Sequence, residues 1–545
     1  MATSKFTNLL KIPPIALFLY ITLLAVYYAF VLNFPLLERI YSLAAADNLL
    51  LALTVPFVLF FAFLIIFSLL SLPYFFKPFM VFLTLTSAAA FYASYKYDVM
   101  FDYDMMQNIF ETNTAEATTY LNFSFFSFFV ITGIIPALLI TFIKIKRPKN
   151  ILSAFLARLE IFTIGVIGLA FLATFFFKGY ASIGRNNTYL NKMINPAHIF
   201  NSVKYLNNKY FTEKLAYIEI GTDSKLVAAK NNKPTLVVLV LGETARAQNF
   251  PYNGYQRNTT PYTEKLGMIG FKDVASCGTA TAISVPCMFS NMPRTQYKHD
   301  RANAQDNVLD LLSHAGIQVY WKDNDSSAKG VDKNFESITI ENKDDPELCI
   351  NASCYDEVLL KGLAQHITAN TKNKLIALHI IGSHGPTYWL RYPKKLEKFT
   401  PSCDRSDLEK CSDEELVNAY DNTLVYTDYF LAQTIALLKK YSDQYNVALM
   451  YLSDHGESLG ESGFYLHGSP YMIAPIYQRR VPWMLWMPEQ YAQAKGIDRQ
   501  CLKEKAKNKV TGISHDNFFH TLLGFYGVKT TAKEEALDLI SDCKI

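Results

Sequence analysis

The sequence predicts an α-helical membrane domain followed by an α/β domain that lies in water. Two observations support this division. Up to about Phe177 the chain is rich in Phe, Leu, Ile and Ala, whereas from Lys178 it has the ordinary composition of a soluble protein. In the second part, apolar runs of strand length alternate with helical patterns, which is typical of a sheet covered by helices. We therefore expect a membrane domain over 1–177, a bridging segment over 178–233 and a soluble domain over 234–545.

Five apolar stretches are long enough to cross the hydrocarbon core of a bilayer as helices, which takes about 20 residues. They contain few charged residues, so buried helices of a soluble protein are a poor alternative. Pro56 and Pro136 fall inside two of them, and membrane helices tolerate proline better than soluble helices do. The predicted spans are Ile12–Phe34, Asn48–Leu70, Phe75–Tyr95, Phe125–Ile143 and Leu152–Phe177.

Charges in the loops predict the orientation of the spans. Basic residues precede the first span and fill the loop 144–149 after the fourth, whereas the loop 97–122 carries only acidic charges. Basic loops face the cytoplasm, so an odd number of spans places the soluble domain outside. The net charge of +4 is nearly balanced and gives no reason to expect nucleic-acid binding.

The eight cysteines all lie in the soluble domain. An even number confined to the domain that is predicted to lie outside the cytoplasm suggests disulfides in an oxidising compartment. Close spacing favours Cys277–Cys287, Cys349–Cys354 and Cys403–Cys411, which leaves Cys501 and Cys543, although spacing does not fix the connectivity. A zinc site built of cysteines is the alternative, but the chain has no Cys-x-x-Cys motif to support it.

The soluble domain alternates strand and helix patterns, which predicts a parallel sheet with helices on both faces. The amphipathic stretch Ala197–Tyr210 of the bridging segment is expected to lie on the membrane surface. The predicted strands are Pro234–Leu241, Ile317–Trp321, Lys374–Ile381, Val447–Leu452 and Pro482–Met487. The predicted helices are Asn307–Ala315, Asp356–Ala369, Glu414–Tyr441 and His515–Tyr526.

Acidic and imidazole side chains follow three of these strands. Glu243 comes just after the first strand, His384 follows the third, and Asp454 and His455 follow the fourth; His467 comes shortly afterwards. The carboxyl ends of parallel strands share one edge of a sheet, where ligands and catalytic groups collect. Carboxylates and imidazoles suit zinc or manganese. The sequence therefore predicts a divalent metal site at this edge.

A small, polar segment between two cysteines offers hydroxyl groups. It runs from Cys277 to Cys287 and contains Thr279 and Thr281. A threonine hydroxyl is a weak nucleophile, but a nearby divalent cation lowers its pKa and orients it. A helix that starts here would favour phosphate at its N-terminus. The alternative is that the two threonines only cap that helix.

Four longer motifs resemble one family, the phosphoethanolamine transferases that modify lipid A, including the group that confers transferable polymyxin resistance. The motifs are Gly242–Phe250, Ser276–Ala282, Gly382–Tyr388 and Ser453–Gly460. The resemblance covers essentially the whole chain. It implies five transmembrane helices in the bacterial inner membrane, then a periplasmic catalytic domain of the alkaline phosphatase and sulfatase type.

The resemblance also implies roles for single residues. Thr281 is expected to be the nucleophile, and His384 and His467 to contact the substrate phosphate or a second zinc and to act as general acid or base. Lys329, with Ser326 nearby, is expected to bind the donor phosphate. The expected ligands of the principal Zn²⁺ are Glu243, Thr281, Asp454 and His455. The residues expected to hold the ethanolamine head group are Asn108, Thr112 and Glu116.

The implied reaction moves phosphoethanolamine from phosphatidylethanolamine to a phosphate of lipid A. It proceeds through a covalent intermediate on Thr281, and it makes the lipid less anionic, which implies polymyxin resistance. A core sugar or a glucan as acceptor is the alternative among enzymes, and a non-catalytic zinc-binding membrane protein is the alternative outside them. We expect a monomer that binds no nucleic acid.

Overall fold

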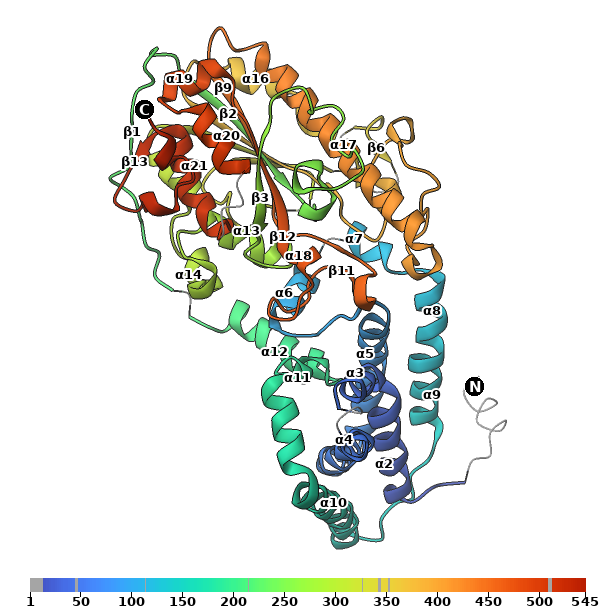
Figure 1. The fold of residues 1–545 in the computed structure, drawn as a ribbon. Coiled ribbons are helices and arrows are strands. Elements are labelled where there is room, and N and C mark those ends of the chain that lie inside the picture. Colours follow the sequence, from blue (N-terminus) through green and yellow to red (C-terminus); the bar gives the residue numbers. More distant parts are fainter. Residues whose placement is uncertain are drawn as a thin grey trace. The chain divides into compact units, whose positions relative to one another are not determined.

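The chain folds into two compact units in this computed structural model (Figure 1). The helical unit comprises Met1–Met106 and Leu121–Tyr210, and the α/β unit comprises Gln107–Tyr120 and Phe211–Ile545. The described residues are 13–44, 48–112, 114–213, 215–325, 327–341, 345–350, 353–507 and 512–545.

The helical unit contains the membrane helices. Four of its described helices are long and apolar enough to cross a bilayer, and the bent pair Leu17–Leu32 and Phe34–Ala44 makes a fifth when it counts as one span. This agrees with the five predicted spans. The other four consist of α4 (Leu49–Leu70), α5 (Phe76–Tyr97), α8 (Phe123–Phe129) continued by η2 (Val130–Ile134) and α9 (Ile135–Phe142), and α10 (Ile151–Asn186).

The first span bends by 60° between η1 (Tyr27–Leu32) and α3 (Phe34–Ala44). Pro35 lacks a backbone N–H at the start of α3, so the hydrogen-bond ladder cannot run on unbroken. Asn33 fills the gap, because its amide donates to the Tyr28 carbonyl and its oxygen accepts the Asn195 N–H.

The outer surface of the helical unit is apolar. Leu53, Phe82, Ile131 and Phe171 are 53%, 55%, 64% and 62% exposed. Exposed apolar side chains of this kind are favourable in lipid but unfavourable in water.

The remaining helices up to residue 210 are α2 (Leu17–Val26), α6 (Tyr103–Glu111), α7 (Thr114–Thr119), α11 (Leu190–Met193) and α12 (Ala197–Tyr210). Helix α12 has the predicted bounds, and its place on the membrane surface stays a prediction.

The α/β unit is built on a seven-stranded sheet in the order β3-β12-β9-β2-β8-β4-β5, with helices on both sides (Figure 1). All five predicted strands form. The two edge strands were not predicted, because β3 is interrupted by polar residues and β5 is a short strand of exposed residues. The strands are β2 (Thr235–Gly242), β3 (Ile269–Ala275), β4 (Gln318–Asp323), β5 (Glu336–Thr339), β8 (Lys374–His379), β9 (Asn446–Ser453) and β12 (Arg480–Trp486).

The sheet is mixed, so the expectation of a purely parallel sheet was wrong for one strand. Strand β12 runs antiparallel to both β9 and β3. Pro482 interrupts its pairing with β3, where the register shifts between Val481 and Trp483, because proline has no N–H to donate to a ladder.

The predicted helices form with one interruption. The stretch predicted as a helix over 356–369 is two short elements, because Gly362 lies between them with φ of +78° and ends the regular backbone. The long helix α17 starts at a capping box in which Ser412 and Glu415 satisfy each other's backbone. The helices are α13 (Thr281–Phe289), α14 (His299–Asn303), α15 (Val308–His314), α16 (Leu363–Thr368), α17 (Asp413–Lys439), α18 (Ile476–Arg479), α19 (Glu489–Lys495), α20 (Arg499–Lys507) and α21 (Phe518–Tyr526).

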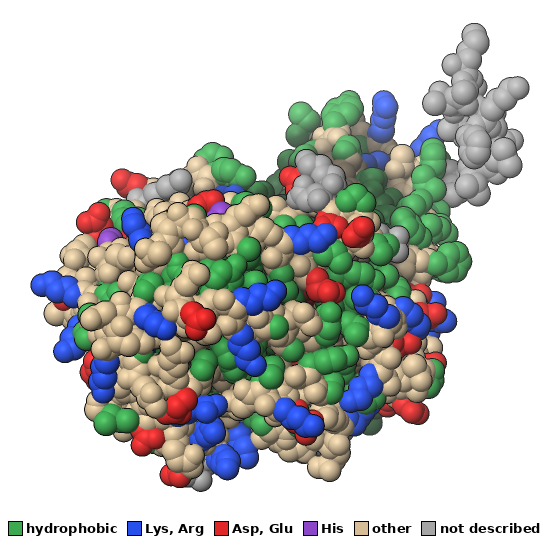
Figure 2. All heavy atoms as spheres, turned by 90° about the horizontal axis from the view of Figure 1, so that it is seen from above, with side chains coloured by type: hydrophobic (Ala, Val, Ile, Leu, Met, Phe, Trp, Pro, Cys, Tyr) green, Lys and Arg blue, Asp and Glu red, His purple; other side chains and the backbone are tan. Residues whose placement is uncertain are grey.

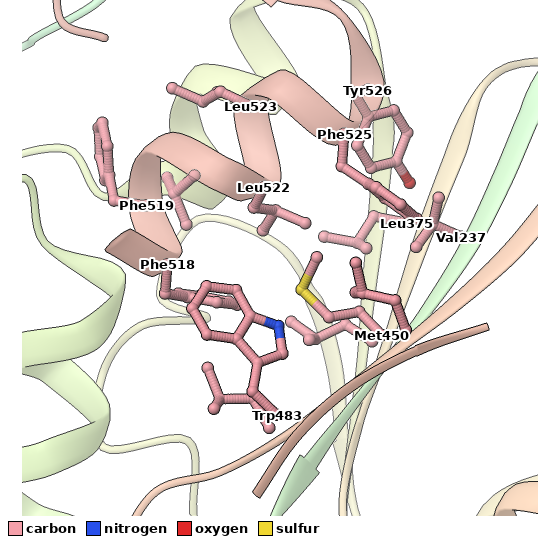
Figure 3. Close-up of a cluster of buried hydrophobic side chains, with 14 of the residues drawn as sticks. Val237, Leu375, Met450, Trp483, Phe518, Phe519, Leu522, Leu523, Phe525 and Tyr526 are labelled. Carbon is pink, nitrogen blue, oxygen red and sulfur yellow. The ribbon is translucent and has the colours of Figure 1, made fainter. Parts of the chain in front are cut away.

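The core of the α/β unit lies between the sheet and α21. Figure 3 shows Phe518, Leu522 and Phe525 of this helix over Met450 and Trp483 of the strands. All are essentially buried, and burying side chains of this size stabilises the fold by about 1.5–3 kcal/mol each. Outside the core, Figure 2 shows Lys and Arg side chains interspersed with Asp and Glu across the face in view.

Four disulfides join the eight cysteines, so the alternative of a cysteine zinc site is wrong. The three pairs favoured by close spacing are confirmed, and the fourth joins the two remaining cysteines across 42 residues. The pairs are Cys277–Cys287, Cys349–Cys354, Cys403–Cys411 and Cys501–Cys543.

Candidate active site

The register of the parallel strands brings the ends of β2 and β9 together. Gly242 pairs with Ser453, so the residues that follow, Glu243 and Asp454-His455, emerge side by side. All three side chains are fully buried. The His455 Nε2 atom lies 3.3 Å from Asp454 Oδ2 and 3.5 Å from Glu243 Oε1. Glu243 and the pair Asp454-His455 are more than two hundred residues apart in the sequence and therefore form one cluster only in the folded chain.

Thr281 completes this cluster as the first residue of α13. Its hydroxyl donates to Glu243 Oε2 at 3.1 Å and lies 3.3 Å from His455 Nε2. The disulfide Cys277–Cys287 joins the loop before the helix to its body. Because Thr281 sits at a helix N-terminus, the unpaired backbone N–H groups there favour an anion such as phosphate beside the hydroxyl.

His515 fixes the Thr281 loop to the end of β9. Its Nδ1 accepts the Cys277 N–H at 3.0 Å, and its Nε2 lies 3.0 Å from the Ser453 carbonyl. These two contacts define a neutral ring with the proton on Nε2, and burial lowers the pKa of His515 to about 4, so the ring stays neutral. Ser284 adds a second bond by donating to the Asp454 carbonyl at 2.5 Å.

The charge of the cluster fits a divalent cation. Burial, and then the neighbouring Asp454, raises the pKa of Glu243 well above its usual range. Each carboxylate keeps one oxygen, Glu243 Oε1 and Asp454 Oδ2, that is buried and has no hydrogen-bond partner among the described residues. Burial also lowers the pKa of His455 to about 4, so the imidazole is neutral. Two carboxylates beside a neutral imidazole are a donor set that zinc prefers.

His384 and His467 lie against this cluster. Ligand atoms of these two histidines and Glu243 fall within 4.8 Å of one another, which allows a second metal position. Their rings are 5.3 Å apart between centroids. His467 Nδ1 lies 2.8 Å from Glu457 Oε2, and Tyr388 donates to the other oxygen of that carboxylate at 2.6 Å. These hydrogen bonds orient the His467 ring so that its Nε2 atom points away from Glu457.

A third group at this edge was not predicted. Asp325 and His379 lie within 4.8 Å of Glu243 by their ligand atoms, and all three are buried. His379 Nδ1 is also 2.9 Å from Asp323 Oδ2. The signal was present, because Asp325 follows strand β4 and His379 ends β8, and the rule that selected Glu243 applies to both.

The residues predicted to bind the donor form no hydrogen bond or ion pair with the cluster of Glu243, Asp454 and His455 among the described residues. Lys329 follows β4 in a left-handed conformation with φ of +50°, and its charge acts on Asp325. In α6 and just after it, the Thr112 hydroxyl donates to the Asn108 carbonyl, and neither side chain has a hydrogen bond to the metal cluster among the described residues. The side chains of Glu116 and Ser326 lie outside the described residues.

The segment Gln107–Tyr120 belongs to the α/β unit, although the rest of that unit begins only at Phe211. The Gln107 amide lies 3.1 Å from Nε2 of His299, which is also 2.8 Å from the Asn303 amide. The segment that carries Asn108 and Thr112 is therefore anchored to α14 of the α/β unit.

Comparison with known proteins identifies the family. A family model described as phosphoethanolamine transferase EptA/EptB matches residues 59–210, and the Sulfatase model matches 235–528. Phosphoethanolamine transferase EptA of Escherichia coli K12 is 40% identical over 98% of this chain and 99% of its own length. The chain belongs to the phosphoethanolamine transferase family. This confirms the resemblance, the assignment as an enzyme and the sulfatase type of the α/β unit.

Two further relatives of this transferase support the assignment. Phosphatidylethanolamine transferase Mcr-1 of Escherichia coli is 38% identical over 94% of this chain and 95% of its own. The integral membrane protein lipooligosaccharide phosphoethanolamine transferase A (EptA) from Neisseria meningitidis matches the structure with a TM-score of 0.93, 34% identity and coverage of 98% and 100%. Together with its apolar helices, this makes the transferase a multi-pass membrane protein.

Proposed function

We propose that the protein transfers phosphoethanolamine from phosphatidylethanolamine to a phosphate of lipid A. The observation that carries this proposal is the Thr281 hydroxyl at the start of α13, within 3.3 Å of both Glu243 and His455 in the buried cluster. The names of the relatives support the donor and the acceptor, since Mcr-1 is called a phosphatidylethanolamine transferase and the Neisseria protein acts on lipooligosaccharide.

We assign the principal Zn²⁺ to Glu243, Thr281, Asp454 and His455; a second ion would be held by His384 and His467. A bound zinc ion supplies positive charge that lowers the pKa of a neighbouring hydroxyl and stabilises charge on a phosphoryl group. Without it, the bare oxygens of Glu243 and Asp454 would repel an anionic phosphodiester.

In the first half-reaction the Thr281 Oγ forms a bond to the donor phosphorus, and the bond from phosphorus to the diacylglycerol oxygen breaks. The threonine proton leaves and a proton joins the departing diacylglycerol. We assign these transfers to His384 or His467, and the support for His467 is that Glu457 holds its Nδ1 atom and leaves its Nε2 atom pointing away from that carboxylate. The product is phosphoethanolamine bound to Thr281.

In the second half-reaction an oxygen of the acceptor phosphate attacks the same phosphorus. The bond to Thr281 breaks, and its oxygen regains a proton. The N-terminus of α13 favours the negative charge that develops on the phosphoryl oxygens in both steps. The acceptor gains an ammonium group, which offsets its anionic charge and weakens its attraction for cationic polymyxins.

The donor head group has two charges that need partners. We assign its phosphate to Lys329 with Ser326 nearby, and its ammonium group to the acidic loop with Asn108, Thr112 and Glu116. Because the donor is a lipid, the active site must face a membrane surface. We place the protein in the bacterial inner membrane with its catalytic unit in the periplasm, where disulfides such as Cys277–Cys287 form.

Mass spectrometry of lipid A from cells that express the protein tests this proposal. Lipid A should gain one phosphoethanolamine, and Thr281→Ala should abolish the gain and form no covalent adduct with a fluorescent phosphatidylethanolamine. Substantial transfer by Thr281→Ala would overturn the mechanism. An adduct at Thr281 with unmodified lipid A, but with a modified core sugar or glucan, would overturn the acceptor.

A further inference from the structure

A cluster of two arginines and one tyrosine lies beside the nucleophile loop and has no part in the mechanism above. The guanidinium carbons of Arg294 and Arg479 lie 4.1 Å and 5.5 Å from the centre of the Tyr471 ring. Arg294 follows α13, while Tyr471 and Arg479 belong to the segment between β11 (Tyr465–Leu466) and β12. We call these three residues the Arg–Tyr cluster.

Hydrogen bonds join the Arg–Tyr cluster to the loop that carries Thr281. The Tyr471 hydroxyl donates to the Ser276 carbonyl at 2.9 Å, and the Ser276 N–H donates to the Arg479 carbonyl at 2.9 Å. The Thr279 hydroxyl donates to the Ser469 carbonyl at 2.6 Å. The cluster therefore borders the same loop as the nucleophile, within the α/β unit.

Among the residues that the structure describes, the two guanidinium groups have no negative partner. Neither forms an ion pair or a side-chain hydrogen bond with the described residues, and the Nε atom of Arg479 is buried without a hydrogen bond. Two cations around a single ring repel each other, and an anion between them would remove that repulsion. By contrast, the next residue, Arg480, is already paired with Asp273 at 2.8 Å.

We propose that the Arg–Tyr cluster is the acceptor subsite, where it binds a phosphate monoester of the glycolipid that receives phosphoethanolamine. This inference rests on the proposed function and concerns the second half-reaction only. Guanidinium groups suit phosphate because their N–H groups bind two oxygens at once. Met472, next to Tyr471 and 77% exposed, offers an apolar contact for the lipid part of such an acceptor.

The two half-reactions separate this subsite from the donor site. Adduct formation at Thr281 is measured by intact mass spectrometry with a fluorescent phosphatidylethanolamine, and transfer is measured against the concentration of purified lipid A. Arg294→Ala and Arg479→Ala should form the adduct at the wild-type rate. Each should raise the KM for lipid A by about 10-fold, since each removes a charge-assisted contact to phosphate. The increase should be smaller at high salt.

Arg480→Ala is the matched control, because it removes a neighbouring arginine that is already paired with Asp273. Its KM for lipid A should stay near the wild-type value. Arg294→Lys keeps the positive charge but cannot bind two phosphate oxygens at once as a guanidinium does. It should recover part of the affinity for lipid A that Arg294→Ala loses. Arg294 is exposed, so its variants test the inference even if Arg479→Ala fails to fold.

An unchanged KM for lipid A in Arg294→Ala would overturn this inference. Equal slowing of adduct formation and transfer would also overturn it, because the arginines would then act through the nucleophile loop. Failure of the wild-type protein to form an adduct at Thr281, or to modify lipid A at all, would instead contradict the proposed function itself.

Discussion

Two buried groups at the same sheet edge balance their charge in different ways. At the end of β4 and β8, Asp323 pairs with His379 at 2.9 Å. Burial alone would lower the pKa of His379, but Asp323 and then Asp325 outweigh it and raise the pKa to about 9. The same contact lowers the pKa of Asp323 against its own burial. This group supplies its own cation.

At the end of β2 and β9 the balance is different. Glu243 and Asp454 are equally buried, yet their imidazole neighbour His455 is neutral. No described lysine or arginine forms an ion pair with either carboxylate. A buried carboxylate pair without a protein cation is costly, so a bound divalent cation would stabilise this cluster. From this comparison we infer that Glu243, Asp454 and His455 form the candidate metal site, whereas Asp323 and His379 form a structural ion pair.

Glu243→Gln should break the metal site and give the largest effect. The variant should lose bound zinc by elemental analysis, and its transfer rate should fall by about 10³-fold or more, since the charge that stabilises the transition state is lost. Its metal-free form should unfold at a higher temperature than metal-free wild type, because one of two repelling carboxylates is gone. Asp428→Asn, which changes a buried carboxylate held by Thr263, is the control and should keep its zinc. Full zinc content in Glu243→Gln would contradict the ligand assignment.

His379→Gln should break the ion pair instead. Removing one partner leaves Asp323 buried and unpaired, which costs about 3–5 kcal/mol of the free energy of unfolding. The loss should be equal with and without a zinc chelator in thermal unfolding. A loss that appears only with zinc bound would show that His379 is a metal ligand, as its proximity to Glu243 and Asp325 permits.

The sequence predicted the central strands well because their burial is visible in single residues. The runs that became β2 and β9 are apolar apart from their ends, and both strands are buried along their whole length. Strand β5 escaped prediction because all four of its residues are exposed. The direction of β12 could not be predicted either, since an apolar run carries no information about which way the chain enters the sheet.

The candidate site was predictable where a motif follows a strand directly. Glu243 and Asp454 could be predicted because they directly follow apolar strands, and Asp325, which follows β4, could have been predicted in the same way. The role of His515 could not be found this way, because it starts a short helical turn near the end of the chain and its partners, Cys277 and Ser453, lie far away in sequence. Such contacts appear only in the folded chain.

His515→Gln tests how strictly the Thr281 loop must be held. Without the imidazole bridge the hydroxyl should shift relative to Glu243, and a displacement of about 1 Å costs on the order of 100-fold in rate. We expect kcat to fall by about 10–100-fold with zinc content and donor KM unchanged. His520→Gln is the matched control, since this buried histidine accepts the Glu534 N–H and does not touch the site. A loss of zinc in His515→Gln would mean that the loop also shapes the metal site.

The smallest expected effect is a pH dependence of stability, and it tests whether His379 carries the charge that balances Asp323. The pKa of His379 is about 9 in the folded state and 6.5 as its ordinary value. A raised pKa means that the stabilisation by His379 is full below pH 6.5 and is lost as the pH rises through 9. Between about pH 7 and pH 9, the free energy of unfolding of wild type should therefore fall by about 2 kcal/mol relative to that of His379→Gln. Thermal unfolding of both proteins with chelator present measures this difference. If the difference in the free energy of unfolding between the two proteins stays constant over that range, His379 is neutral beside Asp323. The Asp323–His379 group and the Glu243–Asp454 group would then not differ in how they balance their charge.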